Sequence, residues 1–247
     1  MLIFVMLFIK KFRLVCIVLL LSVPAAAFAQ SADTQARWKD KNINLAASIA
    51  SSGRGLNSSV IDALKDIPRH RFTEDSYYDI AYEDISLPGA DRGFIPSPSD
   101  VLRSLSMLSP SSTDKILIAG NNTGYAASIL AGLAANIYMI EETAAAAEYP
   151  ALFAEIGIDN ITIAETADIN EFDEIIAFDK IFICGAVAGI SEKLTERLSI
   201  QGNITFILAE EGGFQQLVSM RRSLLGDSIT SGGSCYFPEI KILKITN

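Results

Sequence analysis

The chain has 247 residues and a formal net charge of −9 at pH 7, from 20 basic and 29 acidic side chains. Half of the residues are apolar, which excludes an intrinsically disordered chain and allows one substantial hydrophobic core. The acidic balance excludes a general nucleic-acid binder, because such proteins cluster lysine and arginine on one face. Three cysteines are too few for a disulfide-stapled scaffold of this length.

The N-terminus has the layout of an export signal. Basic residues within 10–13 precede a ten-residue apolar run at 14–23, and Ala29 completes a small-x-small cleavage pattern. Ten apolar residues are about half of what spans a bilayer, so we predict cleavage near Ala29 and no stable membrane span afterwards. The alternative is an uncleaved anchor. The prediction is therefore a signal peptide at 1–29 and one exported domain at 30–247, either periplasmic or secreted.

The first half of this domain is predicted to be helices and loops. A helical piece at 45–51 ends at a pair of glycines, and a second one covers 60–67. Residues 72–99 are rich in Pro, Gly, Asp and Ser, which is typical of loops and short extended pieces. Asp100 is then expected to open an amphipathic helix at 101–108.

From residue 115 onward, short apolar runs alternate with helical segments. This alternation predicts an α/β fold with one doubly wound, mostly parallel sheet and helices on both faces, similar to a Rossmann fold. Extended runs at 215–222 and 235–243, joined by glycine-containing turns, predict an antiparallel hairpin that finishes the sheet. The expected strands are 115–119, 137–140, 161–164, 181–184 and 204–208, and the expected helices are 125–135, 143–156 and 191–198.

The first strand-turn-helix carries the candidate chemistry. Gly120 and Gly124 allow a tight turn, and the free N–H groups at the start of the next helix can meet a polar ligand. Glu141 follows at the end of the next strand, where an acidic side chain can accept hydrogen bonds from both ribose hydroxyls of a nucleoside. The spacing fits nucleoside binding and a purely structural turn about equally well.

These segments together resemble the protein-L-isoaspartate O-methyltransferase family, which has the class I S-adenosylmethionine-dependent methyltransferase fold. The resemblance runs through VIDALKDIPRHRF, YEDISLPGADRGFIPSPSDVLRSLSML, ILIAGNNTGYAASILAGLAANIYMIE and the two C-terminal runs QQLVSMRR and YFPEIKIL. It implies methyl transfer from S-adenosylmethionine to the α-carboxyl of L-isoaspartyl residues in damaged proteins or peptides. The ester then cyclises to a succinimide that can reopen as aspartate. We expect a monomer that binds no nucleic acid.

The cofactor motifs depart from the family pattern at three places. The family has Gly-x-Gly-x-Gly after an acidic residue, whereas this chain has Asn122 as the middle residue and Ile118 at the acidic position. Asp168 lies one place from the aspartate of the family's Gly-Asp-Gly, which contacts adenine. The cofactor-binding set that the resemblance implies is Gly120, Asn122, Gly124, Glu141 and Asp168.

The acceptor loop departs as well. The family has Ile-Ser-x-Pro, with the serine hydroxyl near the substrate carboxyl, and this chain has Pro96 at the serine position. Pro96 has neither a hydroxyl nor an N–H, so Ser97 becomes the candidate catalytic residue if the loop shifts by one residue. The reaction needs little acid-base help, because a carboxylate is already nucleophilic and the protein mainly has to align it in a dry pocket.

Other conspicuous residues have structural interpretations. His70 is the single histidine, so it is a poor metal ligand and is expected to pack beside its neighbours; we predict no metal site. Cys184 and Cys235 either pair in an oxidising compartment or are simple core residues. Export also separates the enzyme from cytosolic S-adenosylmethionine. The alternative function is therefore a catalytically inactive exported methyltransferase fold that acts as a peptide-binding or structural module.

Overall fold

The structure is a computed structural model, and it describes residues 25–53, 55–89, 93–120, 124–141, 144–164 and 177–240. The chain divides into two compact units, Met1–Asp40 and Lys41–Asn247. The predicted apolar run at 14–23 lies outside the described residues, and signal cleavage stays a prediction. No helix in the described part of the chain is long and apolar enough to cross a membrane.

The first described helix, α2, spans Ala25–Ser51. The sequence predicted only its last turns, at 45–51, so the earlier start corrects that prediction. The physical reason is that 25–51 contains neither proline nor glycine, so nothing in its backbone chemistry stops the helix before Gly53. The predicted cleavage point at Ala29 lies within this helix.

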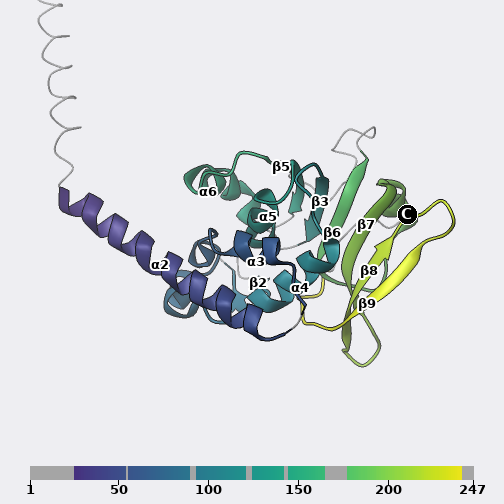
Figure 1. The fold of residues 1–247 in the computed structure, drawn as a ribbon, viewed down its shortest axis with the longest axis horizontal. Coiled ribbons are helices and arrows are strands. Elements are labelled where there is room, and N and C mark those ends of the chain that lie inside the picture. The colour runs from purple at the N-terminus through teal and green to yellow at the C-terminus, as the bar shows by residue number, and fades with distance from the viewer. Residues whose placement is uncertain are drawn as a thin grey trace, which may run out of the picture. The chain divides into compact units, whose positions relative to one another are not determined.

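A seven-stranded sheet forms the centre of the second unit, in the order β5-β4-β3-β6-β7-β8-β9 (Figure 1). The first five strands in this order are parallel, and β7, β8 and β9 are antiparallel. A separate two-stranded hairpin, β1 with β2, lies before α4 in the chain. The strands are β1 Leu87–Pro88, β2 Phe94–Ile95, β3 Lys115–Gly120, β4 Asn136–Glu141, β5 Ile161–Ala164, β6 Phe178–Val187, β7 Leu198–Ala209, β8 Gln215–Arg221 and β9 Ser228–Ser234.

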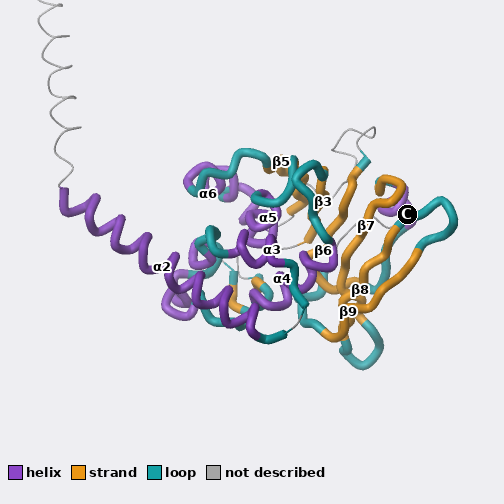
Figure 2. Tube along the Cα trace, viewed as in Figure 1, coloured by secondary structure: helices purple, strands orange, loops and turns teal. Residues whose placement is uncertain are grey.

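Short helices connect these strands and cover the sheet (Figure 2). The mostly parallel sheet with its flanking helices and antiparallel end is the predicted fold class, which is confirmed. The α-helices are α3 Ser58–Leu64, α4 Pro98–Leu108, α5 Gly124–Ala131, α6 Tyr149–Glu155 and α7 Glu192–Glu196. The 3₁₀ helices are η1 Arg69–Arg71, η2 Asp75–Ile80 and η3 Ala144–Ala147.

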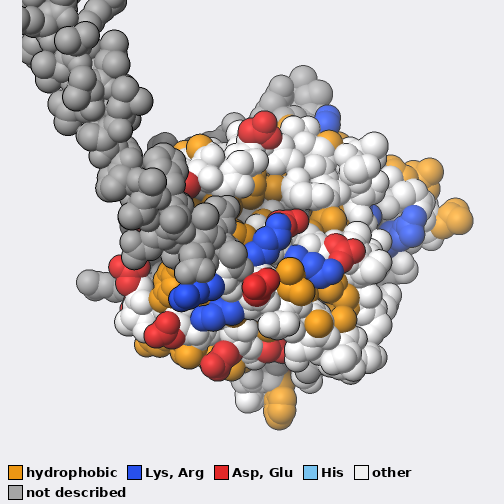
Figure 3. All heavy atoms as spheres, turned by 60° about the vertical axis from the view of Figure 1, so that its left-hand side comes forward, with side chains coloured by type: hydrophobic (Ala, Val, Ile, Leu, Met, Phe, Trp, Pro, Cys, Tyr) orange, Lys and Arg blue, Asp and Glu red, His pale blue; other side chains and the backbone are white. Residues whose placement is uncertain are grey.

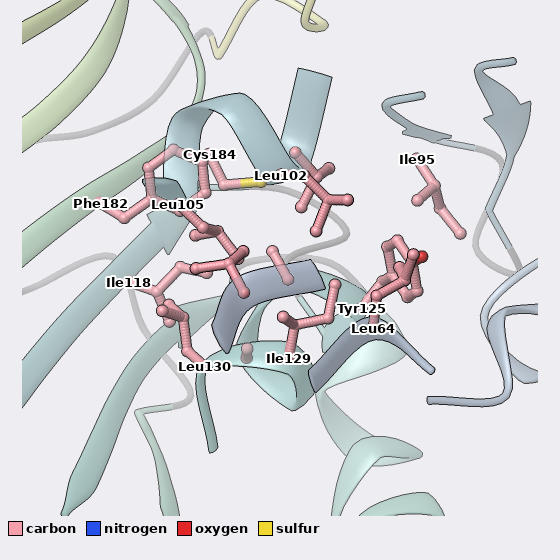
Figure 4. Close-up of a cluster of buried hydrophobic side chains, with 14 of the residues drawn as sticks. Leu64, Ile95, Leu102, Leu105, Ile118, Tyr125, Ile129, Leu130, Phe182 and Cys184 are labelled. Carbon is pink, nitrogen blue, oxygen red and sulfur yellow. The ribbon is translucent and has the colours of Figure 1, made fainter. Parts of the chain in front are cut away.

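Each face of the sheet has its own hydrophobic cluster. Successive side chains of β3 point to opposite faces, so Ile118 belongs to one cluster and Leu117 to the other. The first cluster joins the sheet to α3, α4, α5 and α6, and Figure 4 shows Ile118 near Leu130 and Phe182 within it. In the described part of the chain, α7 covers the second cluster through Leu194.

The C-terminal hairpin forms, but with a different second strand from the predicted one. β8 pairs with β9 at 228–234, not with the described residues 235–240 of the predicted run, and residues 241–243 lie outside the described part of the chain. Gly226 has a φ of 116°, and Asp227 accepts a hydrogen bond from the Ser223 N–H at 3.1 Å, so the chain reverses early. The described residues after β9 return to β6, where the Ala186 N–H donates to the Pro238 carbonyl at 2.9 Å.

The predicted helix at 143–156 is also divided. It consists of η3 and α6, with the N-terminus of α6 at Tyr149. Pro150 explains the division, because proline fits the first turn of a helix but breaks a helix interior. Residues 142 and 143 lie outside the described part of the chain.

Candidate active site

The crevice at the carboxyl ends of β3 and β6 is the candidate cofactor site. From β3 the chain adds β4 and β5 on one side, and it then crosses to β6 and β7 on the other side. Such a reversal of strand order is where open α/β sheets bind their ligands. Gly120 ends β3 at this point, in register with Cys184 of β6 and with Glu141 of β4. The structure therefore brings two of the predicted cofactor residues, Gly120 and Glu141, side by side.

Both flanking glycines are also required by protein packing. A Cβ atom on Gly120 would lie 2.5 Å from the backbone carbonyl oxygen of Cys184. A Cβ atom on Gly124, the first residue of α5, would lie 2.5 Å from the ring of Tyr149. Larger residues would force β3 and β6 apart or displace that ring. The other two predicted cofactor residues, Asn122 and Asp168, lie outside the described residues.

Glu141 is an acidic side chain held out of solvent. It is fully buried at the end of β4. Burial raises the pKa of the neighbouring Cys184 thiol, and the Glu141 charge raises it further. A buried carboxylate at this strand end can accept hydrogen bonds from the two hydroxyls of a ribose, as predicted from its position. The described residues thus fit the nucleoside portion of S-adenosylmethionine.

Ile118 is a core residue. Its side chain is fully buried and faces the helix-covered cluster, which Figure 4 shows around Leu105 and Leu130. This position therefore supplies packing and no carboxylate for the amino-acid portion of the cofactor.

Ser97 is the N-cap of α4, so the prediction that Asp100 opens this helix is wrong. The Asp100 N–H donates to Ser97 Oγ at 3.3 Å, and Pro98 occupies the first helical turn. The helix begins earlier because a proline is favoured in that turn and a serine directly before it is a strong cap. Ser97 Oγ also lies 3.4 Å from Ser99 Oγ. The half-buried Ser97 hydroxyl thus accepts one bond in the cap, and when Ser99 is the donor of the contact between the two hydroxyls, the Ser97 proton is left to donate.

Arg69 holds this acceptor loop in place, a role that the sequence reasoning missed. Its side chain is fully buried, and its guanidinium donates to the carbonyls of Pro96 and Ile85. It also donates to the carbonyls of Ala81 and Glu83. The only signal in the sequence was its place in the family's Pro-Arg motif, at 68–69.

The same guanidinium links the acceptor loop to the cofactor turn. Its carbon lies 5.6 Å from the ring centroid of Tyr125, which follows Gly124 directly in α5. Burial lowers the pKa of Arg69 and raises that of Tyr125. Arg69 Nε and the Tyr125 hydroxyl are both buried without a hydrogen-bond partner in the described part of the protein. An arginine in this fork geometry fixes the loop more rigidly than a lysine would.

Asp84 completes the acceptor side. Its Oδ1 accepts a hydrogen bond from the Ser99 N–H at 2.8 Å, which satisfies one of the free donors at the start of α4. Residue 84 is exposed, so this carboxylate lies at the surface of the loop. An acidic group at a helix N-terminus is favoured by the helix dipole.

His70 packs against aromatic residues. Its ring centroid lies 4.5 Å from that of Tyr78, and its Nδ1 is hydrogen-bonded to the Tyr82 hydroxyl. Burial, followed by the charges of Arg71 and Lys41, lowers the pKa of His70 to about 4. Among the described residues, no three histidine, cysteine, aspartate or glutamate side chains are grouped as metal ligands. Cys184 and Cys235 are both buried free thiols.

The charges on one face of the molecule are mixed. Figure 3 shows one face of the molecule, on which lysine and arginine side chains lie among aspartate and glutamate side chains. The visible part of this face therefore has no single continuous basic area.

Comparisons with known proteins agree with this geometry. The family model described as protein-L-isoaspartate(D-aspartate) O-methyltransferase (PCMT) matches residues 23–235. A protein-L-isoaspartate O-methyltransferase of Desulfosudis oleivorans is 28% identical over 189 residues, which are 76% of this chain and 85% of that protein. One of Methanoregula boonei is 33% identical over 155 residues, which are 62% of this chain and 71% of that protein.

Solved structures show the same fold. A protein-L-isoaspartate O-methyltransferase structure superposes with a TM-score of 0.72 at 18% identity, covering 82% of this chain and 66% of that one. A β-aspartate methyltransferase from Plasmodium falciparum, solved in complex with S-adenosyl-L-homocysteine, has a TM-score of 0.66 at 16% identity and covers 81% and 98%. With its switch-point glycine, its buried strand-end glutamate and a family match over most of its length, the chain belongs to the protein-L-isoaspartate O-methyltransferase family.

Proposed function

We propose that this protein methylates the α-carboxyl of L-isoaspartyl residues in damaged proteins, with S-adenosylmethionine as methyl donor. The observation that carries the proposal is the pairing of Gly120 with Glu141 at the switch point, in a chain matched by the family model over 23–235. The acceptor loop at Pro96–Ser97 is tied through Arg69 to Tyr125, in the helix that starts at the cofactor turn. The two substrates would therefore meet between elements that one buried side chain holds together.

The chemistry asks for alignment more than for acid-base catalysis. When bound, the cofactor supplies an electrophilic methyl group on a sulfonium. Glu141 would hold its ribose, and the backbone at Gly120 would lie beside it. On the acceptor side, the Ser97 hydroxyl has a proton to donate to the substrate carboxylate, which orients the carboxylate without neutralising it. Pro96 contributes its carbonyl to Arg69 and no donor of its own.

We further propose that the protein is exported and acts in the periplasm or outside the cell, as a monomer. The support is the basic residues at 10–13 followed by the apolar run at 14–23 and the small residues that end at Ala29. In that location the supply of S-adenosylmethionine would limit the reaction. Comparing the size of the protein in a membrane-free export fraction with that of the full chain would test the cleavage.

A second candidate function is a peptide-binding module without methyl transfer. It is favoured by two positions that have changed chemistry: Ile118 is buried in the core where the family has an acid, and Pro96 replaces the hydroxyl. This candidate predicts that isoaspartyl peptides bind while S-adenosylmethionine does not. The first candidate predicts that both bind.

Calorimetric titration of the purified protein with S-adenosylmethionine and S-adenosylhomocysteine separates the two candidates. Micromolar binding supports the methyltransferase, and a methyl-transfer assay on an isoaspartyl peptide then follows. Glu141→Gln should weaken cofactor binding about tenfold or more, because the charge-assisted bonds to ribose are lost. Glu210→Gln, an exposed glutamate after β7, is the matched control and should bind normally. The absence of heat at millimolar ligand would exclude methyl transfer.

A further inference from the structure

Three large hydrophobic side chains are exposed next to the acceptor loop. Ile85 is 40% exposed, Phe94 is 53% exposed and Tyr236 is 65% exposed. They come from three separate segments of the chain: the loop before β1, strand β2 and the segment after β9. Single exposed hydrophobic residues need no explanation, but several from different segments around one loop are typical of a binding surface.

Hydrogen bonds place Ile85 and Tyr236 near Ser97, and Phe94 is near it in the chain. The Ile85 carbonyl accepts from Arg69 Nη2 at 2.8 Å, and the Pro96 carbonyl accepts from the same nitrogen at 3.2 Å. Residues 85 and 96 therefore lie on either side of one guanidinium nitrogen. The backbone of residue 85, whose side chain is exposed, therefore lies close to the backbone of the residue that precedes Ser97 in the chain.

The backbone of Tyr236 is connected to the acceptor loop by hydrogen bonds at the start of α4. Its N–H donates to Asp100 Oδ2 at 3.4 Å, and the Asp100 N–H donates to Ser97 Oγ. Arg103 anchors the same segment, because it donates to the Ser234 carbonyl at 2.9 Å and pairs with the Asp100 carboxylate at 3.1 Å. The backbone of residues 234–236 is thus fixed at the start of α4, while the Tyr236 side chain stays in solvent.

Phe94 is exposed because of the strand geometry. Ile95 is buried in the core, as Figure 4 shows, and successive side chains of a strand point to opposite sides. Phe94 therefore points away from the core, two residues before Pro96. Its cross-strand partner in β1 is Pro88, which gives the ring a stiff backbone support.

We propose that Ile85, Phe94 and Tyr236 form an apolar rim that binds the side chains flanking the methyl-accepting residue, so that the preferred substrate is an extended peptide segment with apolar or aromatic flanks. This inference rests on the proposed methyltransferase function and adds a substrate class to it. An extended peptide advances about 3.3 Å per residue, so the residues just before and after the acceptor would reach a rim that borders the acceptor loop. Apolar segments are the ones a protein exposes when it loses its fold.

The test compares two isoaspartyl peptides that differ only in the residues beside the acceptor, leucine in one and serine in the other. Both peptides carry a fluorescent label, and their binding is measured by anisotropy with S-adenosylhomocysteine present, alongside kcat/KM for methyl transfer. The wild-type protein should prefer the leucine peptide about five- to tenfold, as expected for partly burying two apolar side chains. In Phe94→Ser/Tyr236→Ser the preference should fall below twofold.

The control is Leu224→Ser/Leu225→Ser. These leucines are 82% and 100% exposed. They lie in the turn between β8 and β9, which follows Arg221, and Arg221 pairs with Asn203 near the start of β7. This variant should keep the wild-type preference. If the wild type binds both peptides equally, or if the rim variant keeps the preference, the rim is refuted whether or not methyl transfer occurs. If the preference follows the rim in binding and no methyl is transferred, the rim stands and the methyltransferase proposal fails.

Discussion

Replacing Arg69 by lysine tests whether this buried guanidinium holds the acceptor loop. The side chain is fully buried and donates to four backbone carbonyls, at distances from 2.8 to 3.2 Å. The hydrogen bonds to the Ala81 and Pro96 carbonyls are buried. Glu83 and Ile85 are exposed residues, so water can reach their carbonyls. A lysine keeps the positive charge, but its three donors radiate from one point and cannot replace a planar fork.

The magnitude follows from the two buried bonds. A hydrogen bond from a charged donor contributes about 1.5–3 kcal/mol, and a buried carbonyl left without a donor costs about 1–3 kcal/mol. We take one buried bond as lost and one as kept, with water serving the exposed carbonyls. The expected loss in the free energy of unfolding for Arg69→Lys is then about 3 kcal/mol.

Urea denaturation measures this loss directly. With a slope of about 2 kcal/mol per molar urea, the midpoint should fall by about 1.5 M. Arg71→Lys is the matched control, because Arg71 is exposed and pairs with Glu155 on the surface. Arg71→Lys should lower the free energy of unfolding by less than about 1 kcal/mol. Equal midpoint shifts for the two variants would refute the assignment of the loop's stability to Arg69.

Three further results are expected. Gly124→Ala should lower the free energy of unfolding by about 2–3 kcal/mol, because the added Cβ would lie 2.5 Å from the Tyr149 ring. Adding Tyr149→Leu should recover part of the lost stability in urea denaturation. No recovery would contradict the packing argument. Ser97→Ala should lower the free energy of unfolding by about 1 kcal/mol, because the helix cap is lost. Ser97→Asp keeps the cap but has no hydroxyl proton to donate, so it should unfold like the wild type and lose methyl transfer. Full methyl-transfer activity in Ser97→Asp would show that Ser97 is not part of the acceptor site. The pKa of His70 is about 4 in the folded protein and near 6.5 in the unfolded chain. The contribution of neutral His70 to the free energy of unfolding is therefore fully present above pH 6.5 and is lost as the pH falls towards 4. The stability penalty of His70→Gln should therefore be smaller at pH 5 than at pH 7, and an equal penalty would show that His70 is protonated alike in both states.

The fold could be predicted from the sequence because each parallel strand is a short apolar run between turn residues. The segments at 115–119 and 161–164 appear as strands at nearly the expected residues. The errors occur where hydrophobicity carries no information. β9, with the sequence SITSGGS, is exposed along most of its length, so it has the composition of a loop and is a strand only because β8 pairs with it.

The candidate site could be predicted in part for a related reason. Gly120 and Glu141 end adjacent parallel strands, and strand order alone places them together. Apart from the family's Pro-Arg motif, nothing in the sequence indicates the role of Arg69, because its hydrogen-bond partners are backbone carbonyls, which have no sequence signature. The cap at Ser97 was misassigned to Asp100 since both residue types are good caps, and only the position of Pro98 in the first turn decides between them.

Two of the departures from the family pattern, at Ile118 and Pro96, affect different halves of the reaction. Ile118 lies on the cofactor side. There an apolar side chain buried in the core stands in place of the family's carboxylate, and the strand stays intact. Pro96 lies on the acceptor side, where its carbonyl still bonds to Arg69 and the next residue, Ser97, keeps a hydroxyl. The acceptor side therefore has a substitute donor among its described residues, whereas position 118 itself offers none to the cofactor's amino-acid portion. For this reason cofactor affinity, measured before any peptide is added, decides between a repair enzyme and a peptide-binding module.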